Sequence, residues 1–203
     1  MTTAWTWSVT RQGDHEPAAS SNEGCFTSFY LTSHALWRQL SRVSAIQKEI
    51  QQARPFDSKA AEGVVALLRT TDLVRRVLSG VVEARGITLQ QYNVLRILRG
   101  AGPSGLPTLE IGQRMIERSP GVTRLLDRLE AKRLVRRKRC RQDRRQVLCW
   151  ITPAGLDALA DLEAPLARAS GAVLGRLGDA RTSQLIHLLD EVRAAARAAT
   201  IIQ

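Results

Sequence analysis

The residues of this chain that are best suited to chemistry are its arginines and lysines, and they are unevenly distributed. Twelve of the thirty lie between Arg118 and Arg145, where the acidic residues are Asp127, Glu130 and Asp143, so twelve positive charges against three negative ones leave +9 of the formal +11. Cations at this density displace the counterions of a polyanion and supply most of the affinity for nucleic acid. We therefore expect nucleic-acid binding, and the alternative is a basic surface without a specific partner.

A helix is predicted at the start of this basic window. Ser119 is a suitable N-cap and Pro120 a suitable first helical residue. The apolar residues that follow recur at three- and four-residue spacing, which leaves another side made of Gly121, Thr123, Arg124, Asp127 and Arg128. Arginine pairs with guanine acceptors in the major groove, and threonine can bond either base type. This segment is a candidate recognition helix, and the alternative is a solvated helix face.

Two strand-like runs follow the candidate helix. Leu134–Cys140 and Gln146–Thr152 flank a turn at Gln142–Arg145, and the second run is rich in strand-forming residues. We expect a β-hairpin whose turn carries Asp143, Arg144 and Arg145. A basic helix followed by a basic hairpin suits a double-stranded nucleic acid.

Helical patterns on both sides must position these two elements. A helix capped by Asp57 or Ser58 and reaching Gly86 would span ~42 Å, longer than one small core needs, so part of its apolar stripe should meet a partner helix. Thr88 and Gln91 form a capping box for a second helix ending near Gly100. The remaining elements are a loop at 102–105, a short helix capped by Thr108 and ending at Met115, a helix begun by Thr152-Pro153, and a last helix over about 180–198. The fold class is mostly α with a small β-hairpin.

The first 56 residues differ in character from the rest. Seven of the nine aromatic residues precede position 57, and 11–24 is a polar run with Gly, Pro and Ser, typical of a loop or a disordered segment. Leu36–Gln52 has a helical pattern that should end before Arg54-Pro55. We expect 1–56 to be an N-terminal extension, partly disordered or helical.

Several classes of protein find little support in the sequence. No apolar run approaches the ~20 residues of a membrane-spanning helix, and the first residues lack a signal-peptide layout, so a cytoplasmic protein is expected. The histidines are scattered and the cysteines form no CxxC pair, so no metal site and no cofactor is predicted. No phosphate-binding glycine loop, GxSxG or HExxH motif indicates an enzyme. The remaining competitor is an architectural protein that binds DNA or RNA with little sequence preference.

The order of these elements and their motifs resemble the MarR family of winged helix-turn-helix transcriptional regulators from about Asp57 to Ala199. The motifs that carry the resemblance are LQQYNVL at Leu89–Leu95, SPGVTRLLDRLE at Ser119–Glu130, LVRR at Leu134–Arg137, DRR at Asp143–Arg145 and ITPAG at Ile151–Gly155. The resemblance implies a non-enzymatic homodimer on a pseudo-palindromic double-stranded operator. It implies a dimerisation helix at 57–86, a winged helix-turn-helix domain at 87–152 and C-terminal dimerisation helices at 153–203.

The resemblance also implies roles for particular residues. Carried over by position, the major-groove residues are Ser119, Gly121, Thr123, Arg124 and Arg128. Arg145, beside Arg144, is expected in the minor groove, where negative potential selects an inserted guanidinium. Asp143 would orient Arg145, and the alternative is that Asp143 only forms the turn. The chain departs from the family at Arg133, where glycine is common and a positive φ would cost ~1 kcal/mol, and in its 56-residue extension.

The resemblance implies repression that is relieved by a small-molecule effector or by oxidation. Cys140 and Cys149 stand almost symmetrically about Arg144-Arg145, so they could lie near each other in the hairpin, and the neighbouring cations would favour a Cys140 thiolate. A redox switch in the β-hairpin of residues 134–152, which corresponds to the wing of the family fold, is one hypothesis. The alternative is a buried, small hydrophobic Cys149 and an idle surface thiol at Cys140.

Overall fold

The computed structural model describes residues 44–117, 121–140, 143 and 145–201. The chain divides into two compact units, Met1–Asp57 and Ser58–Gln203. In the first unit, α2 (Ala45–Glu49) begins after Ser44, whose hydroxyl accepts a hydrogen bond from the Gln47 amide at 3.3 Å. Within the described residues, the predicted helix Leu36–Gln52 is interrupted at Ser44, whose backbone is extended, and it ends at Glu49, before Gln51 with its φ of 54°. Its first residues, 36–43, lie outside the described range.

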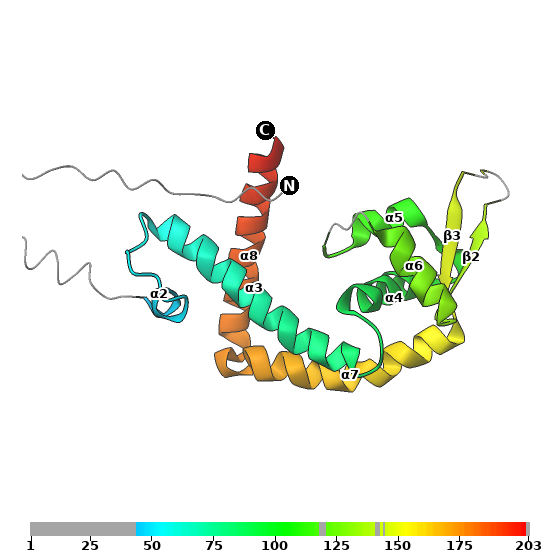
Figure 1. Ribbon diagram of the computed structural model, residues 1–203, viewed down its shortest axis with the longest axis horizontal. Helices are drawn as coiled ribbons and strands as arrows, with labels where there is room; N and C mark the ends of the chain where they lie inside the picture. The colour runs from blue at the N-terminus through cyan, green and yellow to red at the C-terminus, as the bar shows by residue number, and fades with distance from the viewer. Residues whose placement is uncertain (1–43, 118–120, 141–142, 144, 202–203) are drawn as a thin grey trace, which may run out of the picture. The chain divides into compact units, whose positions relative to one another are not determined.

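The second unit is mainly helical with one small antiparallel sheet, which confirms the predicted fold class. Figure 1 shows its elements. The helices are α3 (Lys59–Glu83), α4 (Leu89–Ala101), the 3₁₀ turn η1 (Gly102–Ser104), α5 (Thr108–Arg114), α6 (Val122–Ala131), α7 (Pro153–Leu174), the 3₁₀ turn η2 (Gly175–Leu177) and α8 (Gly178–Ile201). The strands are β1 (Leu106–Pro107), β2 (Val135–Arg139) and β3 (Val147–Ile151). None of the helices in the described part of the chain has the length and apolar character to cross a membrane.

Three helix starts follow the side-chain caps expected from the sequence. Ser58 accepts the amide of Ala61 at 3.1 Å, Thr152 accepts the amide of Gly155 at 3.1 Å, and Thr88 forms a reciprocal capping box with Gln91. The cap predicted at Thr108 is wrong: α5 begins after Pro107, and Thr108 is already helical. The Thr108 hydroxyl instead donates to the Val147 carbonyl oxygen at 3.3 Å, because β3 passes beside this end of the helix.

The sheet has the strand order β1-β3-β2, with both pairs antiparallel. The predicted hairpin is confirmed, and its register runs from Val135 opposite Ile151 to Arg139 opposite Val147. The two-residue strand β1, which pairs Leu106 with Cys149, was not predicted. It turns β3 into the central strand and ties the hairpin to the start of α5.

One apolar core joins the helices to the sheet. Its fully buried large side chains are Leu95, Leu98, Ile111, Leu126, Leu129, Leu159 and Leu162. At the first turn of α7, Gly155 lies so close to the chain after α6 that an added Cβ would stand 2.3 Å from the Leu134 carbonyl oxygen. Only glycine permits this approach, which fixes α7 against the base of the hairpin.

Candidate nucleic-acid interface

Helices α5 and α6 pack closely enough to form a helix-turn-helix pair. An added Cβ at Gly112 would lie 3.5 Å from Cγ2 of Val122, an ordinary packing distance between the two helices. The buried face of α6 consists of Val122, Leu125, Leu126 and Leu129, while Thr123, Arg124, Asp127 and Arg128 are exposed. The division of faces predicted from the apolar spacing is confirmed.

The start of α6 differs from the prediction. The helix begins at Val122 with Gly121 as its N-cap, two residues later than expected, and Ser119 and Pro120 lie outside the described residues. The first turn carries no acidic side chain. The amides at this end of the helix carry a partial positive charge, and Thr123 and Arg124 of the same turn are exposed to solvent.

Strand β2 presents basic side chains on both of its faces. Val135 is buried, and the alternation of a strand places Arg137 and Arg139 on the same face as Val135, towards α6. Arg136 lies on the opposite face, 4.4 Å above the Trp150 ring, and Lys138 is exposed on that face too. In Figure 1 the hairpin stands beside α6.

Arg137 links the hairpin to α6. Its Nη2 lies 2.6 Å from Glu130 Oε2 and 2.7 Å from Asp127 Oδ1, and its Nε donates to Glu130 Oε2 at 2.8 Å. Its backbone amide donates to Glu130 Oε1 at 3.1 Å. Hydrogen bonding to Glu130, opposed by partial burial and aided by Asp127, raises the pKa of Arg137 above its ordinary value. The role of Arg137 was not predicted, although two carboxylates three residues apart on a helix, followed by a strand of consecutive basic residues, were a usable signal.

Within the wing turn, the contacts of Asp143 are those of a turn-forming residue. Its Oδ1 accepts the backbone amide of Arg145 at 3.0 Å, and its carbonyl oxygen accepts the amide of Gln146 at 3.0 Å. Among the contacts of the described residues, none joins the Asp143 carboxylate to the Arg145 guanidinium. Asp143 therefore places Arg145 through the backbone, and the Arg145 side chain is exposed. Arg144 lies outside the described residues.

The two hairpin cysteines do not lie near each other, so that expectation is wrong. Cys149 stands opposite Arg137, whereas the Cys140 amide donates to Gln146, three positions further along the ladder. Three strand positions correspond to ~10 Å and to opposite faces of the sheet, too far for a disulfide within one hairpin. Burial raises the pKa of Cys149, whose Sγ lies 3.7 Å from the Thr108 hydroxyl. Cys149 is thus a buried, small core side chain, and Cys140 is half-buried.

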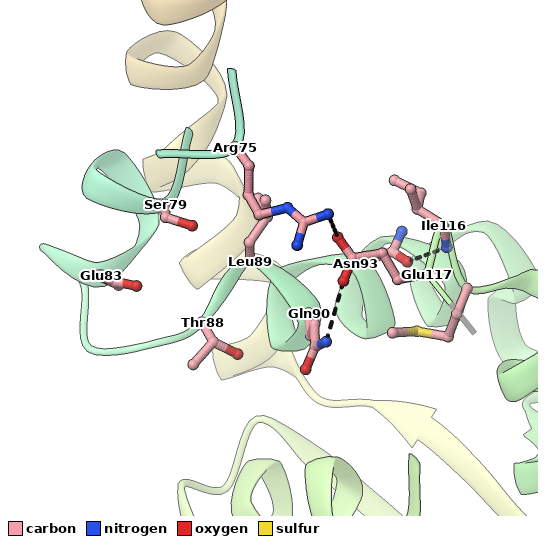
Figure 2. Close-up of a pocket in the computed structure, with 10 residues that line it drawn as sticks. Arg75, Ser79, Glu83, Thr88, Leu89, Gln90, Asn93, Ile116 and Glu117 are labelled. Atoms are coloured by element: carbon pink, nitrogen blue, oxygen red, sulfur yellow. Dashed lines mark hydrogen bonds and ion pairs between the residues drawn. The ribbon is translucent and has the colours of Figure 1, made fainter. Parts of the chain in front are cut away.

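Three contacts hold the segment that leads into α6. Figure 2 shows Arg75 of α3 directed at Glu117, with Nη2 to Oε1 at 2.8 Å. Gln90 of α4 donates to the other Glu117 oxygen at 3.4 Å, and the Asn93 side-chain oxygen accepts the Ile116 amide at 3.0 Å. The residues just before 118–120 are therefore held by α3 and α4. These anchors were not predicted, because they join positions that are far apart in the sequence.

Arg75, Asn93, Ile116 and Glu117 also line a large, open apolar cavity of about 890 Å³ among α3, α4, α7 and α8. Its walls include Val74, Leu78, Leu166 and Leu185, with Tyr92 as the aromatic member. Its charged lining consists of Arg75, Arg96 and Glu117, and the Arg96 guanidinium lies 5.9 Å from the Tyr92 ring centre. The cavity is thus apolar with a net positive edge.

Helices α3 and α8 expose large apolar side chains at many positions. On α3 these include Val64, 57% exposed, and Leu68, 65% exposed, one turn apart. On α8 they include Ile186, Leu188 and Val192. Exposed apolar surface of this extent is typical of an interface. Among the described residues, no group of histidine, cysteine or acidic side chains is arranged to hold a metal ion.

Comparison with known proteins agrees with this geometry. The sequence model described as "MarR family" matches residues 85–146, from the end of the first long helix to the wing. A Thauera aromatica protein, provisionally named as the transcriptional regulator of the hcr operon, is 29% identical over 109 residues. That match covers 54% of this chain and 64% of the relative, so the chain spans less than two thirds of that protein's length.

Two solved structures extend the comparison. The crystal structure of a MarR transcription factor from Planctomyces limnophilus is 38% identical, with a TM-score of 0.54, over 67% of this chain and 98% of that one. The MepR–DNA complex from S. aureus is 21% identical, with a TM-score of 0.59, over 64% of this chain and 96% of that one. The second match is a likeness of fold.

Proposed function

The chain belongs to the MarR family of DNA-binding transcriptional regulators, and from that premise we propose that it is a homodimeric repressor of a pseudo-palindromic operator, relieved by a small-molecule effector. The observation that carries the DNA-binding part is the composition of the exposed side of α6. Thr123, Arg124 and Arg128 share it, and the basic hairpin stands next to it. We propose that these residues, with Ser119 and Gly121, approach base edges in the major groove.

We place the wing in the minor groove. The turn held by Asp143 leaves Arg145 exposed, and a narrow minor groove attracts an inserted guanidinium. Arg144 and Arg145 together form the minor-groove contact in this proposal. The protein would act where the chromosome is, in the cytoplasm.

The proposal is tested by competition binding. We expect a preference of ~10³ or more for the operator over bulk DNA, since an architectural protein binds both alike.

Arg124→Ala should relax base preference at one position of each half-site, at a cost of ~1–3 kcal/mol. Arg145→Ala should weaken operator binding while dimerisation persists. Arg54→Ala, which removes the same charge from an exposed position outside the winged domain and the expected dimerisation helices, is the control and should bind as the wild type does. Equal binding to all duplexes would overturn the proposal.

We place the effector in the cavity among α3, α4, α7 and α8. An apolar wall with Arg75 and Arg96 at its edge suits a small molecule that has an apolar body and one anionic group. A bound anion would compete with Glu117 for Arg75 and so loosen the segment before α6. Intramolecular disulfide formation between Cys140 and Cys149 is not part of this proposal, because their register separates them.

The effector part predicts a charge-selective response. Small aromatic carboxylates, screened by thermal shift against amines of the same size and ring structure, should raise the melting temperature and lower operator affinity, and the amines should do neither. A response to the amines alone would contradict the assignment of Arg75 and Arg96 as the anion-binding groups.

A further inference from the structure

Arg137 is the one described side chain of β2 that is ion-paired with α6 in this structure. The Glu130 carboxylate accepts the backbone amide of Arg137 with one oxygen and the guanidinium with the other. Asp127, one turn earlier on α6, pairs with the same Nη2. Arg137 therefore contacts two successive turns of α6. Its main chain and side chain both bond to Glu130, and its side chain also pairs with Asp127.

This linkage is stiff because of the groups that form it. A guanidinium is planar and donates in fixed directions, so satisfying two carboxylates restricts the angle between the helix and the strand. Arg137 is also the residue opposite Cys149, whose buried side chain sits in the core. The strand position of Arg137 is thereby fixed from the other side of the ladder.

The linkage also has an electrostatic consequence. Asp127 is 53% exposed and Glu130 40% exposed, on the helix that carries Arg124 and Arg128. Without a cation between them, both carboxylates would face a polyanion at short range. Arg137, at 22% exposure, offsets one of these two negative charges without projecting into solvent itself.

We propose that Arg137 is a positioning residue for DNA recognition: it holds α6 and the wing at one angle, so that the base contacts of α6 and the minor-groove contact of Arg145 are made on the same half-site. This inference rests on the proposed function. Arg137 itself need not touch the duplex, and its effect is on selectivity more than on affinity for bulk DNA.

The test compares Arg137→Lys with Glu130→Gln, and uses Lys138→Gln as the control. Lysine keeps the charge but lacks the planar fork, and glutamine at 130 keeps the shape but loses the charge. Lys138 is the next residue of the strand, exposed on the face away from α6. Operator and bulk-DNA affinities are measured for each folded dimer, with thermal unfolding to verify the fold.

We expect Arg137→Lys to bind bulk DNA within about threefold of the wild type and to lose about tenfold in operator preference, the value of one good base contact. Glu130→Gln should also lose preference, and Lys138→Gln should keep it. Arg145→Ala should reduce operator affinity less in the Arg137→Lys background than in the wild type, since Arg137→Lys has already uncoupled the wing from α6. A purely structural role would not produce this non-additivity.

The outcomes separate the inference from the proposed function. Operator preference within twofold of the wild type in both Arg137→Lys and Glu130→Gln, with additive effects of Arg145→Ala, would overturn the positioning role. If Arg137→Lys fails to fold, Glu130→Gln decides by the same criterion. A wild-type protein that shows no operator preference would instead overturn the proposed function.

Discussion

Arg133 carries a backbone conformation that glycine adopts at lower cost. It follows α6 with a φ of 59°, so of the two alternatives for a residue in the place of the family's glycine, a different helix end or a tolerated positive φ, the structure has the second. Three hydrogen bonds hold the turn. The backbone amides of Arg133 and Leu134 donate to the backbone carbonyl oxygens of Glu130 and Leu129, and the Thr152 hydroxyl donates to the Arg133 carbonyl oxygen at 2.8 Å. These bonds compensate for a left-handed residue with a Cβ, whose cost is roughly 1–2 kcal/mol.

Replacing Arg133 with glycine should therefore stabilise the protein. Relief of the strain is partly offset by the greater freedom of glycine in the unfolded chain, roughly 0.4–1 kcal/mol, so the expected gain in unfolding free energy is about 0.5–1 kcal/mol. Chemical denaturation measures it. The control is Ala160→Gly at an exposed position in the interior of α7, which should lose about 0.5–1 kcal/mol. Equal losses for both variants would show that no strain is stored at Arg133.

Site residues were predictable where their position depends on one helix or strand alone, and not where it depends on a contact between elements. The exposed side of α6 followed from apolar spacing, because a helix of fixed period must place Thr123 and Arg124 opposite Leu125 and Leu129. The separation of Cys140 from Cys149 could not be predicted in this way. The hairpin is centred on Asp143, and symmetry in the sequence does not give the strand register. Arg137 was missed because its partners lie across a helix–strand contact.

At the scale of elements, the small sheet positions the interface through contacts that are distant in sequence. Strand β1 pairs with β3 across about forty residues, and two residues after Gly105 give too short a pattern to predict a strand. The hairpin, whose strands are neighbours in the chain, was predicted to within one residue at each end. The helix caps were predictable where the capping side chain bonds within one turn, and Thr108 failed because its hydroxyl bonds to β3 instead.

The contact between α7 and the base of the hairpin yields a sharp prediction. A methyl group at Gly155 would stand 2.3 Å from the Leu134 carbonyl oxygen and 2.7 Å from Ile151 Cγ1, so Gly155→Ala should lower the unfolding free energy by about 1–3 kcal/mol. Gly171→Ala on the same helix meets nothing within 4 Å and should raise it by up to ~1 kcal/mol. Urea denaturation of the two variants gives the comparison. If Gly155→Ala matched Gly171→Ala, the close approach would not hold in solution.

At the scale of the whole molecule, the proposed function requires two copies. A single α6 offers few base contacts, whereas two copies on one face of a duplex would meet half-sites ~34 Å apart. The long helix α3 was predicted to meet a partner, and Val64 and Leu68 remain exposed on it within the described residues. Removing such surfaces from water favours association, and the part of this free energy that exceeds the cost of ordering two copies holds the dimer together.

Charging that surface should separate the two copies. Val64→Asp combined with Leu68→Asp places two carboxylates one turn apart on α3, and burying them unpaired in an interface is costly. We expect monomers in sedimentation velocity and a loss of operator affinity of ~10² or more, because the second half-site then contributes nothing. Leu109→Asp with Gln113→Asp adds the same charge at the same spacing on exposed positions of α5, outside the expected dimerisation helices, and should remain dimeric. A doubly charged α3 that still dimerises and binds the operator would place the interface elsewhere.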